Sequence, residues 1–62
     1  MYEVLVECHY KGKKERMEFK TLYEVEVYLI DNGFTYDEFD EDVNIFYWTK
    51  GHFTYAEVYL VE

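Results

Sequence analysis

Residues 21–33 have the sequence Thr-Leu-Tyr-Glu-Val-Glu-Val-Tyr-Leu-Ile-Asp-Asn-Gly. Two folds are possible for this chain, and they differ in whether this segment is a helix or a strand. As a helix, the stretch begins at Thr21 as N-cap, and Glu24 three residues later completes a capping box. Gly33 then lies just past the helix end, where glycine adopts a left-handed conformation at little cost. One face of this helix is apolar and consists of Leu22, Val25 and Leu29.

The same stretch is also compatible with a β-strand. Valine and leucine alternate with acidic and aromatic residues between Glu24 and Leu29, and Asn32-Gly33 is typical of a tight hairpin turn. We favour the helix because the cap, the stop and the length of the segment agree. The strand alternative predicts an all-β small barrel.

Alternating segments on both sides of this stretch predict strands. Residues 2–10 and 15–20 each alternate between two faces and flank a lysine-rich turn, which predicts a β-hairpin. Residues 43–49 and 52–61 predict a second hairpin around a Lys-Gly pair. We therefore expect an α+β fold: a small four-stranded antiparallel sheet in ββαββ order with one helix packed on one face. Between the helix and the second hairpin, residues 34–42 carry five acids, so we expect an exposed and partly irregular connection there.

The length of the chain limits its core. At 62 residues there is room for a single domain, residues 1–62, and a core of this size rarely contributes more than about 3–5 kcal/mol. Half of the residues are apolar and 23% are aromatic, which is too hydrophobic for a disordered acidic chain. Because a single cysteine excludes an internal disulfide, we expect additional stability from self-association or from dense aromatic packing.

One helix covers only one face of a four-stranded sheet, and two of the predicted strands are apolar or aromatic on both faces. The uncovered face therefore presents either Tyr47, Tyr55 and Tyr59, or Phe46 and Trp48. An exposed aromatic patch usually marks an interface, where Tyr and Trp are enriched. The candidate residues for self-association, for example as a homodimer, are Tyr47, Trp48, Tyr55 and Tyr59.

Several classes of protein find no support in the sequence. No apolar run is long enough to cross a membrane, and the alternating first residues do not predict a signal peptide. A lone cysteine favours a reducing compartment, so we expect a cytoplasmic protein. Cys8 and His9 are adjacent in a predicted strand, so their side chains point to opposite faces and cannot form a nucleophile–base pair.

Metal binding and catalysis also lack a motif. Residues 37–42 do not have the spacing or the glycine of a calcium loop. Acid–base catalysis by two carboxyl groups requires different pKa values, which burial of one group produces. Exposed neighbouring acids lack this difference in environment. His9 and His52 lack the spacing of a zinc site. We expect no enzyme activity, no cofactor and no metal site, and we expect the basic turn at residues 11–16 to be solvated.

The charge of the chain is strongly asymmetric. Residues 1–20 contain four acids and five bases, whereas residues 21–62 contain ten acids and one base, Lys50, and the net charge of the chain is −8. Such a surface attracts basic proteins and repels nucleic acid and anionic membranes. We therefore expect a basic protein as partner, and neither nucleic acid nor membrane.

This asymmetry leads to the first functional hypothesis, a small acidic protein-binding protein. In size, acidity and aromatic content the chain resembles small phage or mobile-element inhibitors. Its carboxylates would imitate nucleic acid and occupy the cationic groove of a nucleic-acid-binding host protein, with aromatic residues as apolar anchors. The predicted partner-binding residues are Glu24, Glu26, Asp31, Tyr36, Asp37, Glu38, Phe39, Asp40, Glu41 and Asp42.

The alternative hypothesis is a small homo-oligomeric interaction module or accessory subunit without catalytic activity. In that case the net charge only keeps the protein in solution.

Overall fold

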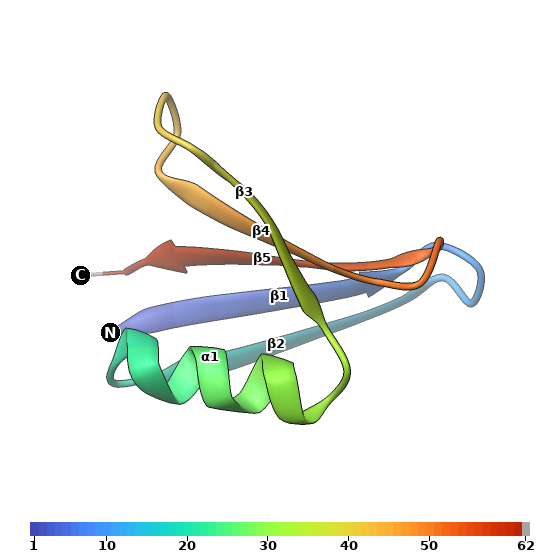
Figure 1. The fold of residues 1–62 in the computed structure, drawn as a ribbon, viewed down its shortest axis with the longest axis horizontal. Helices are drawn as coiled ribbons and strands as arrows, with labels where there is room; N and C mark the ends of the chain where they lie inside the picture. Colours follow the sequence, from blue (N-terminus) through green and yellow to red (C-terminus); the bar gives the residue numbers. More distant parts are fainter. Residues whose placement is uncertain (62) are drawn as a thin grey trace.

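The alternating segments form strands, and the computed structural model describes residues 1–61 as one helix and five strands (Figure 1). The elements in chain order are β1 (Tyr2–Cys8), β2 (Lys13–Phe19), α1 (Leu22–Asp31), β3 (Thr35–Asp40), β4 (Ile45–Lys50) and β5 (Thr54–Leu60). All neighbouring strands are antiparallel, and the sheet order is β2-β1-β5-β4-β3. The first and last strands of the chain therefore pair with each other inside the sheet, and β2 and β3 form its edges.

The stretch at residues 21–33 is the predicted helix, and the all-β alternative is wrong. The capping box is formed: the Glu24 N–H donates to Thr21 Oγ1 over 3.2 Å, and the Thr21 N–H donates to Glu24 Oε1 over 3.1 Å. Two backbone donors at the helix start are thereby satisfied. Gly33 has a φ of +84°, the left-handed conformation expected of a residue just past the helix.

The sheet differs from the expected ββαββ order in one element. The acidic segment includes an edge strand, β3, in place of an irregular connection, so the order is ββαβββ. Tyr36 packs on Trp48 of β4 with ring centroids 5.5 Å apart. Phe39 packs on Phe46 with centroids 4.5 Å apart.

A β-bulge explains why the sequence of β3 lacks the regular alternation of side chains that predicts a strand. The register of β3 against β4 shifts between Tyr36 and Glu38, so one extra residue is inserted. Tyr36 and Phe39 therefore reach the same side of the sheet at a spacing of three residues, where a regular strand requires an even spacing.

The core lies between α1 and the side of the sheet that faces it. Val4 on β1 is opposite Val58 on β5, and both are fully buried. The cluster of buried residues consists of Val4, Val25, Leu29, Phe34, Trp48, Ala56 and Val58. α1 lies along β1 and β2, whereas β3 rises away from the helix and forms the edge of the sheet opposite β2 (Figure 1). One ten-residue helix thus leaves part of β3 and β4 uncovered.

The register decides which aromatic residues face the helix. Trp48 is opposite the buried Ala56, so it points to the helix side and exposes only 7% of its surface. Tyr47, Tyr55 and Tyr59 point to the other side of the sheet, which we call the open face. The structure therefore places Trp48 and these three tyrosines on opposite sides of the sheet.

We expect the cap of α1 to stabilise the fold measurably. Replacing Thr21 by alanine removes the oxygen that accepts the Glu24 N–H, and we expect a loss of about 1 kcal/mol in the free energy of unfolding. Thr21→Ser keeps a hydroxyl and serves as the matched control. Urea denaturation followed by circular dichroism measures both variants. Equal stability of Thr21→Ala and Thr21→Ser would show that the capping hydrogen bond contributes nothing.

Candidate partner-binding surface

The exposed aromatic residues of β3 lie on the helix side of the sheet. Tyr36 packs edge-to-face on Trp48 of β4 and Phe39 packs at a tilt on Phe46, and the two side chains still expose 49% and 42% of their surfaces. Within residues 1–61, no strand pairs with the outer edge of β3. Two aromatic side chains and a row of backbone hydrogen-bonding groups are therefore accessible to a partner.

A groove lies between α1 and the β3–β4 hairpin, because the helix lies over β1 and β2. It has a volume of about 320 Å³, and its lining residues are Leu22, Glu26, Tyr36, Phe46 and Trp48. Four apolar or aromatic side chains thus surround one carboxylate. The fold brings together Glu26 and Tyr36, two of the predicted partner-binding residues, from different elements.

The other two predicted helix residues do not line this groove. Glu24 is engaged in the capping box with Thr21, and it lies two residues, or roughly 160° around the helix, from Glu26. Asp31 is exposed in the last turn and also lies on a different side of the helix from Glu26. The side chains of the three acids of α1 therefore project from different sides of the helix.

The outer side of α1 carries a second apolar stripe, which a search for one buried face overlooks. Tyr23, Val27 and Ile30 have i, i+4, i+7 spacing and expose 74%, 40% and 61% of their surfaces. The stripe adjoins the Glu26 side of the helix. Its spacing is visible in the sequence, but a helix on a small core is expected to have one apolar face. Exposed apolar surface therefore continues from the groove onto the outside of the helix.

Two acids of the β3 segment lie on the opposite side of the sheet from its aromatic residues. Glu38 is opposite Tyr47 and Asp40 is opposite Ile45, so both carboxylates lie on the open face. The Asp42 N–H donates to Asp40 Oδ1 over 3.0 Å in the turn that follows. β3 thus places aromatic residues toward the groove and carboxylates toward the open face. The remaining acids of this segment are exposed and are Asp37 and Glu41.

The Tyr47 hydroxyl lies in the negative electrostatic field of this part of the open face. Burial raises the pKa of the Tyr47 hydroxyl, and neighbouring carboxylates raise it further. In decreasing order of effect, these carboxylates belong to Glu57, Asp40 and Glu38. The half of the open face over β3, β4 and β5 is therefore negative.

The half of the open face over β1 and β2 is neutralised by ion pairs. Arg16 Nε lies 2.6 Å from Glu3 Oε1, and Lys14 Nζ lies 3.7 Å from Glu7 Oε1. Both glutamates are largely buried, and both bases are exposed. The bases of the N-terminal hairpin therefore do not neutralise the acids of β3.

The tyrosines of the open face are half-buried. The Tyr55 hydroxyl donates to Glu7 Oε2 over 2.7 Å and lies 3.1 Å from His9 Nε2. This hydrogen bond lowers the pKa of Glu7 and raises the pKa of Tyr55. Burial, followed by a hydrogen bond to Glu3, raises the pKa of Tyr59. Of the three candidate tyrosines for self-association, Tyr55 thus has an internal hydrogen-bond partner, Glu7.

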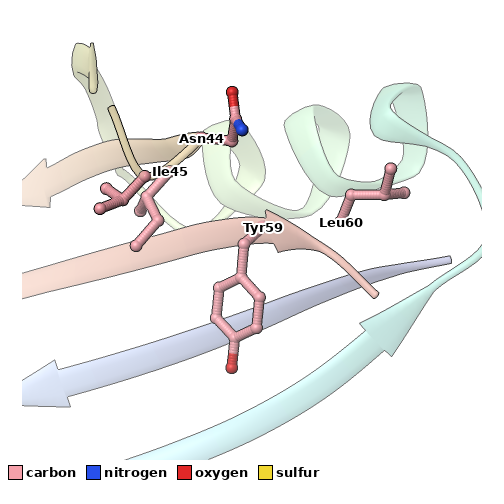
Figure 2. A pocket seen from close by; sticks show the side chains of 5 residues that line it. Asn44, Ile45, Tyr59 and Leu60 are labelled. Atoms are coloured by element: carbon pink, nitrogen blue, oxygen red, sulfur yellow. The ribbon is translucent and has the colours of Figure 1, made fainter. Parts of the chain in front are cut away.

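A second hollow lies where β4 begins and β5 ends (Figure 2). Tyr59 and Leu60 are neighbours on β5 and project to opposite sides of the strand, so the hollow spans the end of the sheet. Its volume is about 420 Å³, and its lining residues are Val43, Asn44, Ile45, Tyr59 and Leu60. With Tyr59 as its one titratable side chain, this hollow does not hold an acid–base pair.

The part of the chain that the structure describes contains no group of three or more His, Cys, Asp and Glu side chains that could hold a metal ion. It also has no helix long and apolar enough to span a membrane. Comparison of the chain with protein families, curated proteins and solved structures gives no match. The geometry and charge of the surface are therefore the basis for a functional proposal.

The hydrogen bond between Tyr55 and Glu7 predicts a specific pH dependence. A carboxyl whose pKa is lower in the folded chain stabilises the fold above its unfolded pKa, near 4.5 for Glu7. That contribution is lost as the pH falls through the folded pKa. We expect Tyr55→Phe to lower the free energy of unfolding at pH 7 and to have a smaller effect at pH 3.

Urea denaturation at both pH values measures this difference, and an NMR titration of the Glu7 carboxyl carbon should show a higher pKa in Tyr55→Phe. The control is Tyr10→Phe, because Tyr10 is exposed. A Glu7 pKa that is the same in the native protein and in Tyr55→Phe would contradict the prediction.

Proposed function

We propose that this chain is a small protein-binding protein that recognises a positively charged protein surface. The observation that carries the proposal is an uncovered aromatic groove beside an acidic edge strand. Tyr36 and Phe39 are accessible next to this groove, and Glu26 lies within it. An apolar centre with a polar rim is the usual anatomy of a protein–protein interface.

Aromatic residues supply the affinity in this proposal. Tyr36 and Phe39 are held in place by packing against aromatic rings of β4, so little side-chain freedom is lost when a partner covers them. The groove floor contains Trp48 and Phe46, and Tyr and Trp are enriched among the residues that dominate binding energy. The outer stripe of α1 extends the same apolar surface.

The acids supply attraction and selectivity. Within residues 1–61, every ion pair of the structure involves Glu3 or Glu7 on β1. The acids of α1 and β3 therefore direct their field outward, in a chain with a net charge of −8. Such a field accelerates encounter with a cationic surface and disfavours acidic partners.

The partner class that we propose is a nucleic-acid-binding protein whose cationic groove accepts the acidic edge in place of nucleic acid. Proteins of this class expose Lys and Arg along a groove, because nucleic acid carries a dense row of phosphates. Bound there, the chain would act as an inhibitor, as small phage or mobile-element proteins do. Self-association through the three tyrosines of the open face is less favoured, because these side chains are half-buried and the Tyr55 hydroxyl already donates to Glu7.

The test uses the fraction of a bacterial lysate that binds heparin, since this fraction is rich in cationic grooves. We expect the immobilised native protein to retain a protein from it that salt and added duplex DNA both release. The double variant Tyr36→Ser and Phe39→Ser should bind that protein at least about 30-fold more weakly, the effect of losing one strong interface anchor. The double variant Glu38→Gln and Asp40→Asn should also weaken binding.

The control with the same change in charge is Glu15→Gln and Glu18→Gln, because both residues are exposed on β2. We expect this control to bind as the native protein does. Equal binding by the control and both β3 variants would refute the proposed surface. Release by salt but not by DNA would refute the imitation of nucleic acid and leave protein binding in place.

A further inference from the structure

The groove between α1 and the β3–β4 hairpin combines three aromatic rings with one carboxylate. The rings belong to Tyr36, Phe46 and Trp48, and the carboxylate belongs to Glu26. Trp48 is buried and Phe46 is half-buried, whereas Tyr36 exposes 49% of its surface. The planes of the Tyr36 and Trp48 rings meet at 74°. These two rings therefore form walls of the groove that face different directions.

The carboxylate of Glu26 has no positive partner in the part of the chain that the structure describes. The ion pairs there involve only Glu3 and Glu7 on β1. The residues three and four positions from Glu26 on the helix are apolar or aromatic: Leu22, Tyr23, Leu29 and Ile30. Lys50, the one base of residues 21–62, has its Nζ 5.8 Å from the centre of the Phe34 ring. A positive charge that complements Glu26 therefore comes from another molecule.

We propose that this groove binds the side chain of an arginine that the partner presents. The inference rests on the proposed function, because arginine is the residue that nucleic-acid-binding proteins commonly direct at phosphates. The guanidinium group lies against the aromatic rings, and its N–H groups donate to the Glu26 carboxylate. The acids of the chain thus attract the partner, and the groove accepts one particular side chain from it.

The aromatic rings attract the guanidinium group through their faces. The face of a ring is negative, and a cation within about 6 Å of the ring centre is drawn to it, most strongly by tryptophan. Guanidinium is planar, so it also stacks on rings. It is more weakly hydrated than an ammonium group, so less hydration is lost when it enters the groove. The exposed ring of Tyr36 is the most accessible of the three for this contact.

The carboxylate distinguishes between the cations that aromatic rings attract. A quaternary ammonium group binds to rings but has no N–H to donate to Glu26. A lysine ammonium group donates, but it is compact and strongly hydrated, so it gains less from the rings. Guanidinium has five N–H donors in a planar fork that matches the two oxygens of a carboxylate. Three rings beside one carboxylate therefore favour arginine.

The size of the groove suits a single long side chain. Its volume of about 320 Å³ is at the lower end of the roughly 300–1,000 Å³ that is typical of ligand sites. Leu22 adds apolar surface against which the aliphatic part of arginine packs while its charged end reaches Glu26. Because Glu26 is exposed, solvent screens the ion pair, so the site contributes selectivity more than affinity.

The experiment uses the fluorescence of Trp48, which is the single tryptophan of the chain and lies in the groove. The probe is the peptide acetyl-Gly-Arg-Gly-amide at low salt. The matched probe contains citrulline, which has nearly the shape of arginine but no charge. We expect the arginine peptide to bind about fivefold more tightly than the citrulline peptide. Peptides with lysine or trimethyl-lysine should bind more weakly than the arginine peptide.

Two substitutions separate the effect of the charge from that of the ring. Glu26→Gln keeps the shape of the side chain and should weaken binding of the arginine peptide about fivefold, with no effect on the citrulline peptide. Tyr36→Leu keeps apolar bulk without a ring and should weaken binding about threefold. Tyr36→Phe keeps the ring and should bind as the native protein does.

The matched control for Glu26→Gln is Asp31→Asn. It removes one negative charge from an exposed residue on a different side of the same helix, and we expect it to bind the arginine peptide as the native protein does. Circular dichroism checks that each variant folds. An NMR titration with the same peptides checks that the shifted signals belong to residues of the groove.

Equal binding of the arginine and citrulline peptides would overturn the proposal, as would no response to either peptide by fluorescence and by NMR. So would arginine binding that is unchanged in Glu26→Gln. Tighter binding of the trimethyl-lysine peptide would assign the groove to a quaternary ammonium ligand and overturn the choice of arginine.

The capture experiment on the lysate tests the proposed function separately. A captured protein together with no response to the arginine peptide refutes this inference alone. A response to the arginine peptide without any captured protein refutes the proposed function, while the preference of the groove for arginine stands.

Discussion

The antiparallel pairing of β1 with β5 holds the two halves of the fold together. It sets Tyr2 opposite Leu60 and Cys8 opposite Thr54, so it joins the two ends of the chain. Without it, the hairpin of β1 and β2 with α1 would be separate from the meander of β3, β4 and β5. The pair also forms the floor of the core, since Val4 and Val58 face each other across it and are fully buried. Such distant pairing requires a large loop to close before its contacts form, so the core depends on contacts that no local segment provides.

This central pairing determines where the accessible surfaces lie. With β1 and β5 inside the sheet, β2 and the acidic strand β3 become its opposite edges. The short connection from β2 to α1 then keeps the helix over β1 and β2. Because one ten-residue helix does not cover five strands, the aromatic side chains of β3 and β4 remain partly exposed. The groove and the charged edges are thus consequences of one topology.

The candidate site shows where local patterns identify residues and where they do not. Glu26 and Tyr36 belong to different elements, and they meet in one groove only because the helix and the β3–β4 hairpin share a side of the sheet. Acidic composition alone groups Glu24 with Glu26, but the capping box engages Glu24 with Thr21 instead. The outer apolar stripe of α1 is readable from its spacing, yet its exposure depends on which side of the helix the sheet occupies. Trp48 belongs to the groove and not to the tyrosines, because its register with Ala56 turns it toward the helix.

The helix and four of the strands are predictable from the sequence, because the capping box, the glycine after the helix and the alternation of side chains are local signals. The net charge and its uneven distribution along the chain are also evident there. The fifth strand could not be found in this way, since a bulge breaks the alternation of the acidic segment and packing on Phe46 and Trp48 stabilises it. Nor could the face that the helix covers, because both faces of β4 and β5 carry apolar or aromatic residues. Sheet order and register are set by pairing between distant strands, which local periodicity does not encode.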